Sequence, residues 1–403
     1  MQSDTPDKPA VVIAGAGPVG LCAALKLARD GVSSLVLEKE PVLPTDLRAS
    51  TFHPPTLDML EELRLADAVL RQGLKVPTWQ VRLHETHERA VFDLAVLQAD
   101  TTHPYRVQFE QADFCRLLAQ SAAQSEQIDL RFGARVTGLT QNGDSVRVEW
   151  STGDETTSVS APYLIAADGA NSALRELLHV NFSGLTYPET TILATTTFPF
   201  ENDLPGLSWV NYCWAEHGTF SLLKVPDRWR CSLYPDPGEP EEQALQPDHV
   251  QEKLQRIVPN PEGYEILEIR PYRIHQRIID SYRVGRVLFA GDAAHVNSPS
   301  GGMGMNCGIH DAFNLTDKLS KILNHGAGDE LLDLYDRQRR PIARDEILKQ
   351  ADANRRRMQE RDPAARRKEL KRLQKIAADP AAAREFLLRS SMIAGLREAA
   401  SIT

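Results

Sequence analysis

The pattern that most constrains the fold lies near the N-terminus, where an apolar run is followed at once by three spaced glycines. Residues 10–14 are small or β-branched, as in a buried strand, and Gly15, Gly17 and Gly20 then form a G-x-G-x-x-G sequence. A segment with helical apolar periodicity comes next, and a second apolar run occupies residues 34–37. This order predicts a strand, a tight turn, a helix and a second strand, which together form a βαβ unit.

Each part of this unit has a physical role in binding a dinucleotide. Gly15 permits the tight turn, Gly17 lets the backbone approach a pyrophosphate, and Gly20 lets the helix pack closely on the strand. The start of the helix, at Pro18 and Val19, offers free N–H groups and a partial positive charge to phosphates. We therefore predict a dinucleotide site here; the alternative is a glycine-rich turn without a ligand.

An acid stands where such a unit places one to bind ribose. Glu38 ends the second apolar run, roughly 20 residues beyond Gly20, and Lys39 follows it. At the tip of the second strand, the Glu38 carboxylate is expected to accept hydrogen bonds from ribose hydroxyls.

Two later apolar runs each end in a glycine and an aspartate. Asp168 and Gly169 follow the first run, and Gly291 and Asp292 follow the second. Open α/β sheets bind their ligands beyond the carboxyl ends of the strands, so acids at these positions are candidates for ligand contacts.

A glycine-rich loop, residues 299–306, follows His295. We expect its backbone N–H groups, and the start of a helix near Gly308, to lie at a strand's carboxyl edge, where they suit an anion or a polarised carbonyl. A purely structural turn is the alternative. His295 itself could relay protons, or it could only hydrogen-bond the loop.

Composition excludes several classes of protein. The net charge of −9 offers no general positive field, which argues against a nucleic-acid partner. The five cysteines are scattered without a C-x-x-C or Cys/His cluster, so we expect no metal site and a reducing, cytoplasmic location. The apolar segment 10–28 is broken by glycines and a proline, so we expect no signal peptide and no membrane span.

The middle of the chain has a different character. Residues 79–105 and 181–283 contain many aromatics and short alternating runs, which predict an antiparallel sheet. Residues beyond 329 look helical to the end of the sequence. Polar and aromatic side chains of the middle sheet are candidates for substrate contacts, although most aromatics in such a sheet belong to a core. The candidates are Asn211, Tyr212, Trp214 and Tyr234.

The three motifs in this order resemble those of the FAD-dependent aromatic hydroxylases, the single-component flavoprotein monooxygenases typified by para-hydroxybenzoate hydroxylase. The resemblance implies an α/β + β architecture: a Rossmann-like FAD-binding domain of the GR2 type, an inserted antiparallel-sheet substrate domain and a C-terminal helical tail. The boundaries it implies are 1–78, 106–180 and 284–328 for the FAD-binding domain, 79–105 and 181–283 for the substrate domain, and 329–403 for the helical segment.

The resemblance also implies roles for individual residues. The G-x-G-x-x-G segment and Glu38 match the ADP half of the FAD site, and Asp168 matches an acid associated with both FAD and NAD(P)H. Arg48 and Gln111 match contacts to the pyrophosphate and ribityl chain, and Asp292 matches an anchor of the ribityl chain. The loop that would cradle the isoalloxazine ring includes Pro299, Gly302, Gly304, Met305 and Asn306.

The activity implied by the resemblance is hydroxylation of a phenolic, amino-aromatic or polyketide-like small molecule. NAD(P)H would reduce FAD, and O2 would then give a C4a-hydroperoxyflavin that transfers OH to the ring. Pro299 and His295 are the candidate catalytic residues, and a homodimer is possible. Two alternatives stay open: a flavin-dependent halogenase or reductase of the same superfamily, and a non-catalytic flavin redox sensor.

Overall fold

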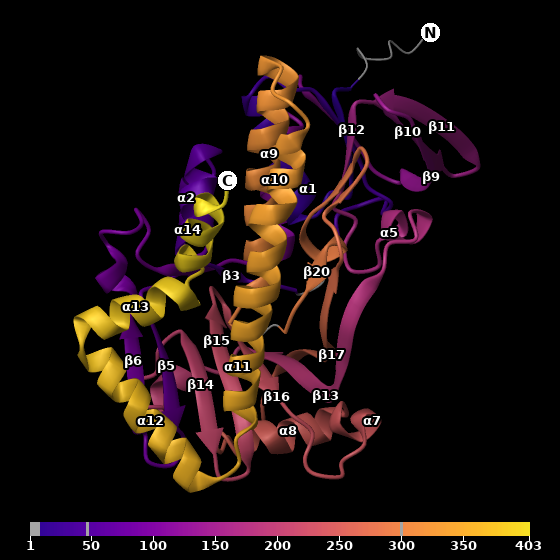
Figure 1. Ribbon diagram of the computed structural model, residues 1–403. Helices are drawn as coiled ribbons and strands as arrows, with labels where there is room; N and C mark the ends of the chain where they lie inside the picture. Colours follow the sequence, from indigo (N-terminus) through magenta and orange to yellow (C-terminus); the bar gives the residue numbers. More distant parts are fainter. Residues whose placement is uncertain (1–8, 46–47, 299–300) are drawn as a thin grey trace.

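The computed structural model describes residues 9–45, 48–298 and 301–403. Two large sheets organise the described chain, one of six strands and one of eight, and two smaller three-stranded sheets flank them. A column of three helices, α9 to α11, runs along both large sheets, and the last helices of the chain fold back over one end of the eight-stranded sheet (Figure 1).

The six-stranded sheet contains all the apolar runs that precede the glycine and aspartate motifs. Its order is β18-β19-β12-β1-β2-β8. The pairs β19–β12, β12–β1, β1–β2 and β2–β8 are parallel, so these strands end at one edge of the sheet. The prediction of a βαβ unit with two further parallel strands is therefore confirmed. The bounds are β1 Val11–Ala14, β2 Ser34–Leu37, β8 Ile128–Arg131, β12 Tyr163–Ala166, β18 Arg283–Val284 and β19 Val287–Phe289.

Helix α1 (Pro18–Arg29) lies on this sheet and packs against α4 (Gln111–Ala122) and α9 (Gly304–His325). Small side chains make the close packing possible, since Ala23 and Ala24 are completely buried on α1. Towards its C-terminal end, α1 is also tied to α9 by polar contacts, since the ammonium group of Lys26 lies 3.1 Å from a carboxylate oxygen of Asp317. The N-terminus of α1 is thereby held at the edge where the parallel strands end.

The eight-stranded sheet has the order β20-β17-β13-β16-β15-β14-β5-β6. We predicted an antiparallel sheet, and the pairing is antiparallel except for β14 with β5, which are parallel. These two strands come from separate chain segments, so no hairpin turn fixes their direction. The bounds are β5 Thr78–Leu83, β6 Arg89–Asp93, β13 Phe182–Thr196, β14 Val210–Ala215, β15 Gly218–Val225, β16 Arg228–Leu233, β17 Ile266–Ile279 and β20 His295–Val296.

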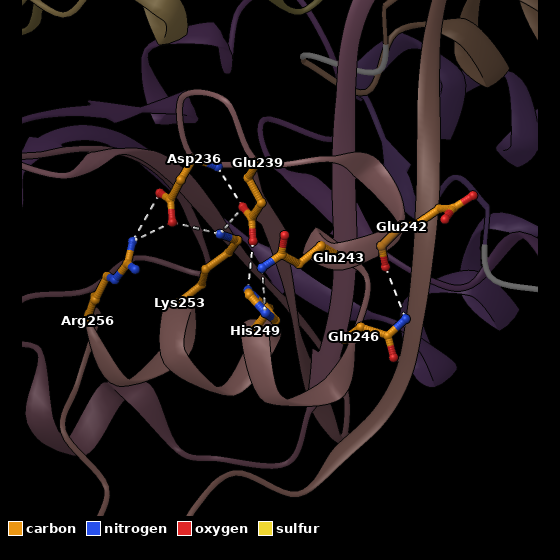
Figure 2. Close-up of polar contacts among 8 residues, drawn as sticks. All are labelled: Asp236, Glu239, Glu242, Gln243, Gln246, His249, Lys253 and Arg256. Carbon is orange, nitrogen blue, oxygen red and sulfur yellow. Dashed lines mark hydrogen bonds and ion pairs between the residues drawn. The ribbon is translucent and has the colours of Figure 1, made fainter.

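An ion cluster fastens α8 (Pro247–Gln255) to the loop after β16 (Figure 2). The ammonium group of Lys253 lies 2.6 Å from a carboxylate oxygen of Glu239 and 3.0 Å from one of Asp236. The guanidinium of Arg256 is also 3.0 Å from Asp236. Two acids thus neutralise two cations here, and the cluster anchors the helix rather than presenting an unbalanced charge.

The C-terminal part of the chain is helical, as predicted, and it builds a wall on the eight-stranded sheet. Leu370 and Leu373 are buried in one apolar cluster with Trp79 and Phe92 of that sheet. No helix in the described part of the chain combines the length and apolar content that a membrane crossing requires. The bounds are α10 Glu330–Pro341, a π-helical turn Ile342–Ile347, α11 Leu348–Gln359, α12 Pro363–Ala378, α13 Pro380–Ser390 and α14 Ile393–Ser401.

The packing of α12 on the sheet yields a stability prediction. Leu373→Ala is expected to lower the free energy of unfolding by about 2–5 kcal/mol, because it leaves a cavity in a completely buried position. Lys371→Ala, on the exposed side of the same helix, is expected to change it by less than about 0.5 kcal/mol. Urea unfolding measures both, and equal effects would contradict the packing described.

Candidate functional site

The turn after β1 is shaped by steric contacts that exclude side chains at two of its glycines. Gly15 has φ +103°, and a Cβ on it would lie 2.3 Å from the carbonyl oxygen of Ala167. A Cβ on Gly20 would lie 2.0 Å from the carbonyl oxygen of Gly15. A Cβ on Gly17 would meet nothing within 4 Å. Gly15 and Gly20 are thus needed by the fold, whereas Gly17 faces open space where a ligand can approach the helix.

Glu38 lies beside this turn and hydrogen-bonds its backbone. One carboxylate oxygen accepts from the N–H of Ala16 at 2.8 Å, and the other accepts from the N–H of Glu40 at 2.9 Å. The side chain is half-buried, while its neighbour Lys39 is exposed. The predicted position at the end of β2 is confirmed, and binding of ribose stays a prediction.

Asp168 occupies the corresponding place at the end of β12. One of its carboxylate oxygens accepts a hydrogen bond from the N–H of Leu174 at 3.2 Å, and Gly169 follows it in the turn. The other oxygen is buried and has no partner among the described residues. Burial raises the pKa of this carboxyl. An unsatisfied acceptor at the strand edge fits a site that a ligand donor completes.

The turn at Gly291 and Asp292 is held from behind by a buried carboxylate, that of Asp311 on α9. One oxygen of Asp311 accepts from the N–H of Gly291 at 3.2 Å and lies 2.9 Å from Nε2 of His295. The other oxygen accepts from Nε of Arg339 at 2.7 Å. Burial raises the pKa of Asp311, but Arg339 and His295 more than offset this, so that it lies below its ordinary value.

His295 therefore lies behind the turn, 1% exposed, with Asp311 as its partner. This placement supports the alternative of a histidine that hydrogen-bonds the structure, and a role in catalysis stays a prediction. The other candidate catalytic residue, Pro299, lies outside the described residues.

Asp292 itself points to the open side of the turn. Its side chain is exposed, yet the surrounding protein desolvates it enough to raise its pKa, while His295 and then Arg48 act in the opposite direction. Tyr272 of β17, 43% exposed, has a pKa raised to about 12 by desolvation and then by the Asp292 carboxylate, with Arg48 again opposing. Arg48, Tyr272 and Asp292 are thus close enough to act on one another electrostatically.

Arg48 and Gln111 are positioned through the backbone of one short segment. The carbonyl oxygen of Arg48 accepts from Arg230, which also pairs with Glu110, the residue before α4. Gln111 begins α4, and its side-chain oxygen lies 3.4 Å from the N–H of Ala49. Gln111 therefore lies beside Ala49, the residue after Arg48. Contact of Arg48 and Gln111 with a cofactor stays a prediction.

The glycine-rich loop is clamped by the completely buried side chain of Asn306. Its oxygen accepts from the N–H of His53 at 2.9 Å, and its nitrogen donates to the carbonyls of Thr51 and Gly302 at 2.8 and 2.7 Å. Nε2 of His53 lies 2.8 Å from the carbonyl oxygen of Gly301. Burial, followed by the charge of Arg106, holds the pKa of His53 well below its usual range, so His53 is neutral and donates this bond.

Helix α9 starts at Gly304, four residues earlier than the expected start near Gly308, and Met305 lies buried in its first turn. The earlier start matters because it places Gly308 inside the helix, facing two other motifs. A Cβ on Gly308 would lie 2.7 Å from the side chain of Val19 and 2.9 Å from Cα of Gly291. The first motif, the third motif and the first turns of α9, which follow the glycine loop, therefore meet at one place.

The four candidate substrate residues have different surroundings. Asn211 is completely buried and bonded to Gln80 at 2.6 Å, and the indole N–H of Trp214 donates to the carbonyl of Arg357 at 2.9 Å. Both have partners within the protein. Tyr234 lines a cavity at the far end of the sheet, close to the ion cluster of Figure 2. Contact of these three with substrate stays a prediction.

Tyr212 alone of the four lines a narrow, partly enclosed cavity that also reaches Gly301. The cavity lies between the eight-stranded sheet, the loop clamped by Asn306 and the helices α11 and α13. Most of its lining was not among the candidates, because the residues come from elements far apart in the sequence. They include Trp79, Arg106, Arg357, Phe386 and Ser390. The one local feature that could have pointed to a lining residue is the charged Arg106 at the start of a short buried strand, β7 (Arg106–Gln108).

Comparison with known proteins agrees with this geometry. The family model described as "FAD binding domain" matches residues 8–350. The 6-hydroxy-3-succinoylpyridine 3-monooxygenase HspB of Pseudomonas putida (strain DSM 28022 / S16) is 33% identical over 83% of this chain and 84% of its own length. The para-nitrophenol 4-monooxygenase of Pseudomonas sp. (strain WBC-3) is 31% identical, over 87% of each chain.

Solved structures show the same fold. The crystal structure of p-nitrophenol 4-monooxygenase PnpA from Pseudomonas putida DLL-E4 superposes with a TM-score of 0.89 and 30% identity, and the match covers 96% of this chain and 98% of that one. Aklavinone-11 hydroxylase, solved with FAD and aklavinone, gives a TM-score of 0.77 at 27% identity, covering 89% and 70% of the two chains.

Two alanine substitutions in the first turn separate folding from ligand binding. Gly20→Ala is expected to lower the free energy of unfolding by about 3 kcal/mol, because its methyl group would collide with backbone. Gly17→Ala is expected to leave stability within about 0.5 kcal/mol but to weaken dinucleotide binding, because its methyl group enters the space beside the helix N-terminus. Thermal unfolding and ligand retention on desalting measure the two effects. Unchanged retention in Gly17→Ala would contradict this assignment.

Proposed function

Because this chain belongs to the FAD-binding family of flavin-dependent aromatic monooxygenases, we propose that it uses NAD(P)H and O2 to hydroxylate a small aromatic molecule. The observation that carries the proposal is the meeting of Val19, Gly291 and Gly308, since it brings together the start of α1, the Gly-Asp turn and the start of α9, which the glycine loop precedes. The aromatic cavity begins at Gly301 of that loop.

The residues present fit FAD. The open face at Gly17 and the start of α1 suit the pyrophosphate, and Glu38 lies beside them for the ribose. The exposed carboxylate of Asp292, with Arg48 nearby, suits the ribityl chain and its phosphates. Residues 301–306 would then carry the ring. Bound FAD supplies a ring that NAD(P)H reduces and that activates O2.

The chain's own part is to position the substrate and to exclude water from it. Trp79, Tyr212 and Phe386 offer aromatic walls, and their rings contact one another: Trp79 lies 5.9 Å from Tyr212 and 6.1 Å from Phe386, between centroids. Such walls hold a flat ring and keep the site dry, which protects reactive species from loss to water.

The test is oxidation of NAD(P)H by the FAD-loaded protein under air, with and without a panel of phenols, anilines and hydroxypyridines. We expect several-fold stimulation by at least one single-ring compound, with a hydroxylated product identified by mass spectrometry. A protein that takes up no FAD, or whose NAD(P)H oxidation no aromatic stimulates, would contradict the proposal. A product formed only with chloride present would instead support the halogenase alternative.

Asp292→Ala is expected to weaken FAD binding by about 1–3 kcal/mol, since the anchor proposed for the ribityl hydroxyls disappears. This corresponds to a loss of affinity of roughly tenfold or more. Asp280→Ala, which removes an exposed acid at the end of β17, serves as the control and is expected to keep full affinity. Titration of the apoprotein with FAD gives both values, and equal affinities would remove Asp292 from the site.

A further inference from the structure

The feature that the function above leaves unused is a buried arginine in the wall of the aromatic cavity. Arg106 is 3% exposed, and no carboxylate pairs with it among the described residues. Arg230 and Arg339, buried in neighbouring parts of the core, pair with Glu110 and Asp311 respectively. Burying a charge is costly unless it is paired, so an unpaired guanidinium in a cavity wall calls for an explanation.

The contacts that Arg106 makes are with uncharged groups. Its Nη2 lies 3.5 Å from the carbonyl oxygen of Ser390, beyond the usual hydrogen-bond range, and its guanidinium carbon lies 5.3 Å from the centre of the Trp79 ring. Desolvation lowers the pKa of Arg106, and the Tyr212 hydroxyl acts in the opposite direction, through its charge and a side-chain hydrogen bond. None of these partners is a carboxylate, and Nε of the guanidinium has no partner among the described residues.

Three residues that line this cavity carry buried polar atoms without a partner among the described residues. These atoms are Nε of Arg106, Nε1 of Trp79 and Oγ of Ser390. All three groups can donate a hydrogen bond, and an arginine or indole N–H can do nothing else. Since most buried polar atoms in proteins find partners, three unpaired donors around one cavity indicate that an acceptor belongs there.

A second arginine in the same wall provides an internal comparison. Arg357 also lines the cavity, but its Nε lies 3.3 Å from a carboxylate oxygen of Glu369 and its Nη1 donates to Asn354 at 3.1 Å. Its charge is therefore compensated by the protein, whereas that of Arg106 is left for a ligand.

We propose that Arg106 binds the oxyanion of an aromatic substrate, a phenolate or a carboxylate, and so makes the cavity selective for anionic rings. The planar fork of a guanidinium matches such a group, and the indole of Trp79 and the hydroxyl of Ser390 supply further donors. Gly301 of the glycine-rich loop lines the same cavity, so an anion at Arg106 would place the ring beside that loop. This inference rests on the proposed function, because it assumes that the cavity receives the substrate.

The experiment compares anions with neutral molecules of the same shape. The FAD-loaded protein is titrated by calorimetry with benzoate against benzamide, and with 4-nitrophenolate, above the pKa of the phenol, against nitrobenzene. We expect at least one anion to bind ten or more times tighter than its neutral counterpart, and the pair that shows this identifies carboxylate or phenolate as the group recognised. In Arg106→Met, the affinity for that anion is expected to fall at least tenfold, while affinity for the neutral molecule changes less than threefold.

Two further variants serve as controls. Arg357→Met is the matched control, since it removes a compensated arginine from the same wall, and the anion preference is expected to persist. Arg106→Lys keeps the charge without the fork and is expected to keep part of the preference. Because Arg106 is an unpaired buried charge, Arg106→Met without ligand is expected to melt no lower than the parent, and only the rise in melting temperature caused by the anion is lost.

Equal affinity of the parent protein for anions and neutral rings would overturn the inference, even if no variant folded. So would an anion preference that survives in Arg106→Met, or one that Arg357→Met loses equally. The two proposals fail separately: absence of FAD binding overturns the proposed function, whereas neutral rings that bind as well as anions and stimulate NAD(P)H oxidation overturn only the role of Arg106.

Discussion

The cofactor edge of this protein depends on one buried carboxylate, that of Asp311. It accepts hydrogen bonds from the N–H of Gly291 and from Arg339, and it lies beside Nε2 of His295. A side chain of α9 thereby sets the path of the turn that presents Asp292. Removing one partner from a buried ion pair typically costs about 3–5 kcal/mol, which makes the arrangement rigid. A short side chain such as that of Asp292 can then be presented on the exposed side of the turn, because the hydrogen bonds of Asp311 fix the backbone of the turn.

The sequence was informative wherever local sterics or strand order decide the structure. A side chain at Gly15 or Gly20 would collide with backbone atoms, those of Ala167 and of Gly15 respectively. The spacing of the glycines in the sequence therefore predicts the turn. Asp168 and Asp292 could be placed because each ends an apolar run, and parallel strands end at a common edge. The placement of these turns at one edge of the sheet was therefore predictable from residues taken a few at a time.

The cavity was not predictable in this way, because its lining is assembled by packing between distant elements. Trp79, Arg106 and Phe386 come from β5, β7 and α13, and no spacing in the chain relates them. Asn211 was nominated from the same strand as Tyr212, but successive residues of a strand face opposite sides, and the Asn211 side chain is bonded to Gln80. The bounds of the long strand β17 were not predictable for a related reason: charged residues and Pro271 interrupt its apolar pattern, and its pairing with β13 and β20 defines it.

The turns of the parallel sheet and the cavity beside Arg106 are built by different parts of the chain. The turns proposed to hold the cofactor belong to the parallel sheet and α9, whereas the cavity wall opposite the eight-stranded sheet is supplied by α11 and α13. Of these two helices, α13 packs on β5 and β6 through stacked rings. Trp79 and Phe92 lie 4.5 Å apart between ring centres, and Phe386 lies 4.7 Å from Phe92. One face of this stack is core and the other is cavity wall, so the same contacts that fasten the C-terminal helices also shape the space beside Arg106. A substitution that shifts α13 is therefore expected to change the shape of this cavity and the stability of the protein together, while leaving the turns at Gly15, Gly20 and Gly291 untouched.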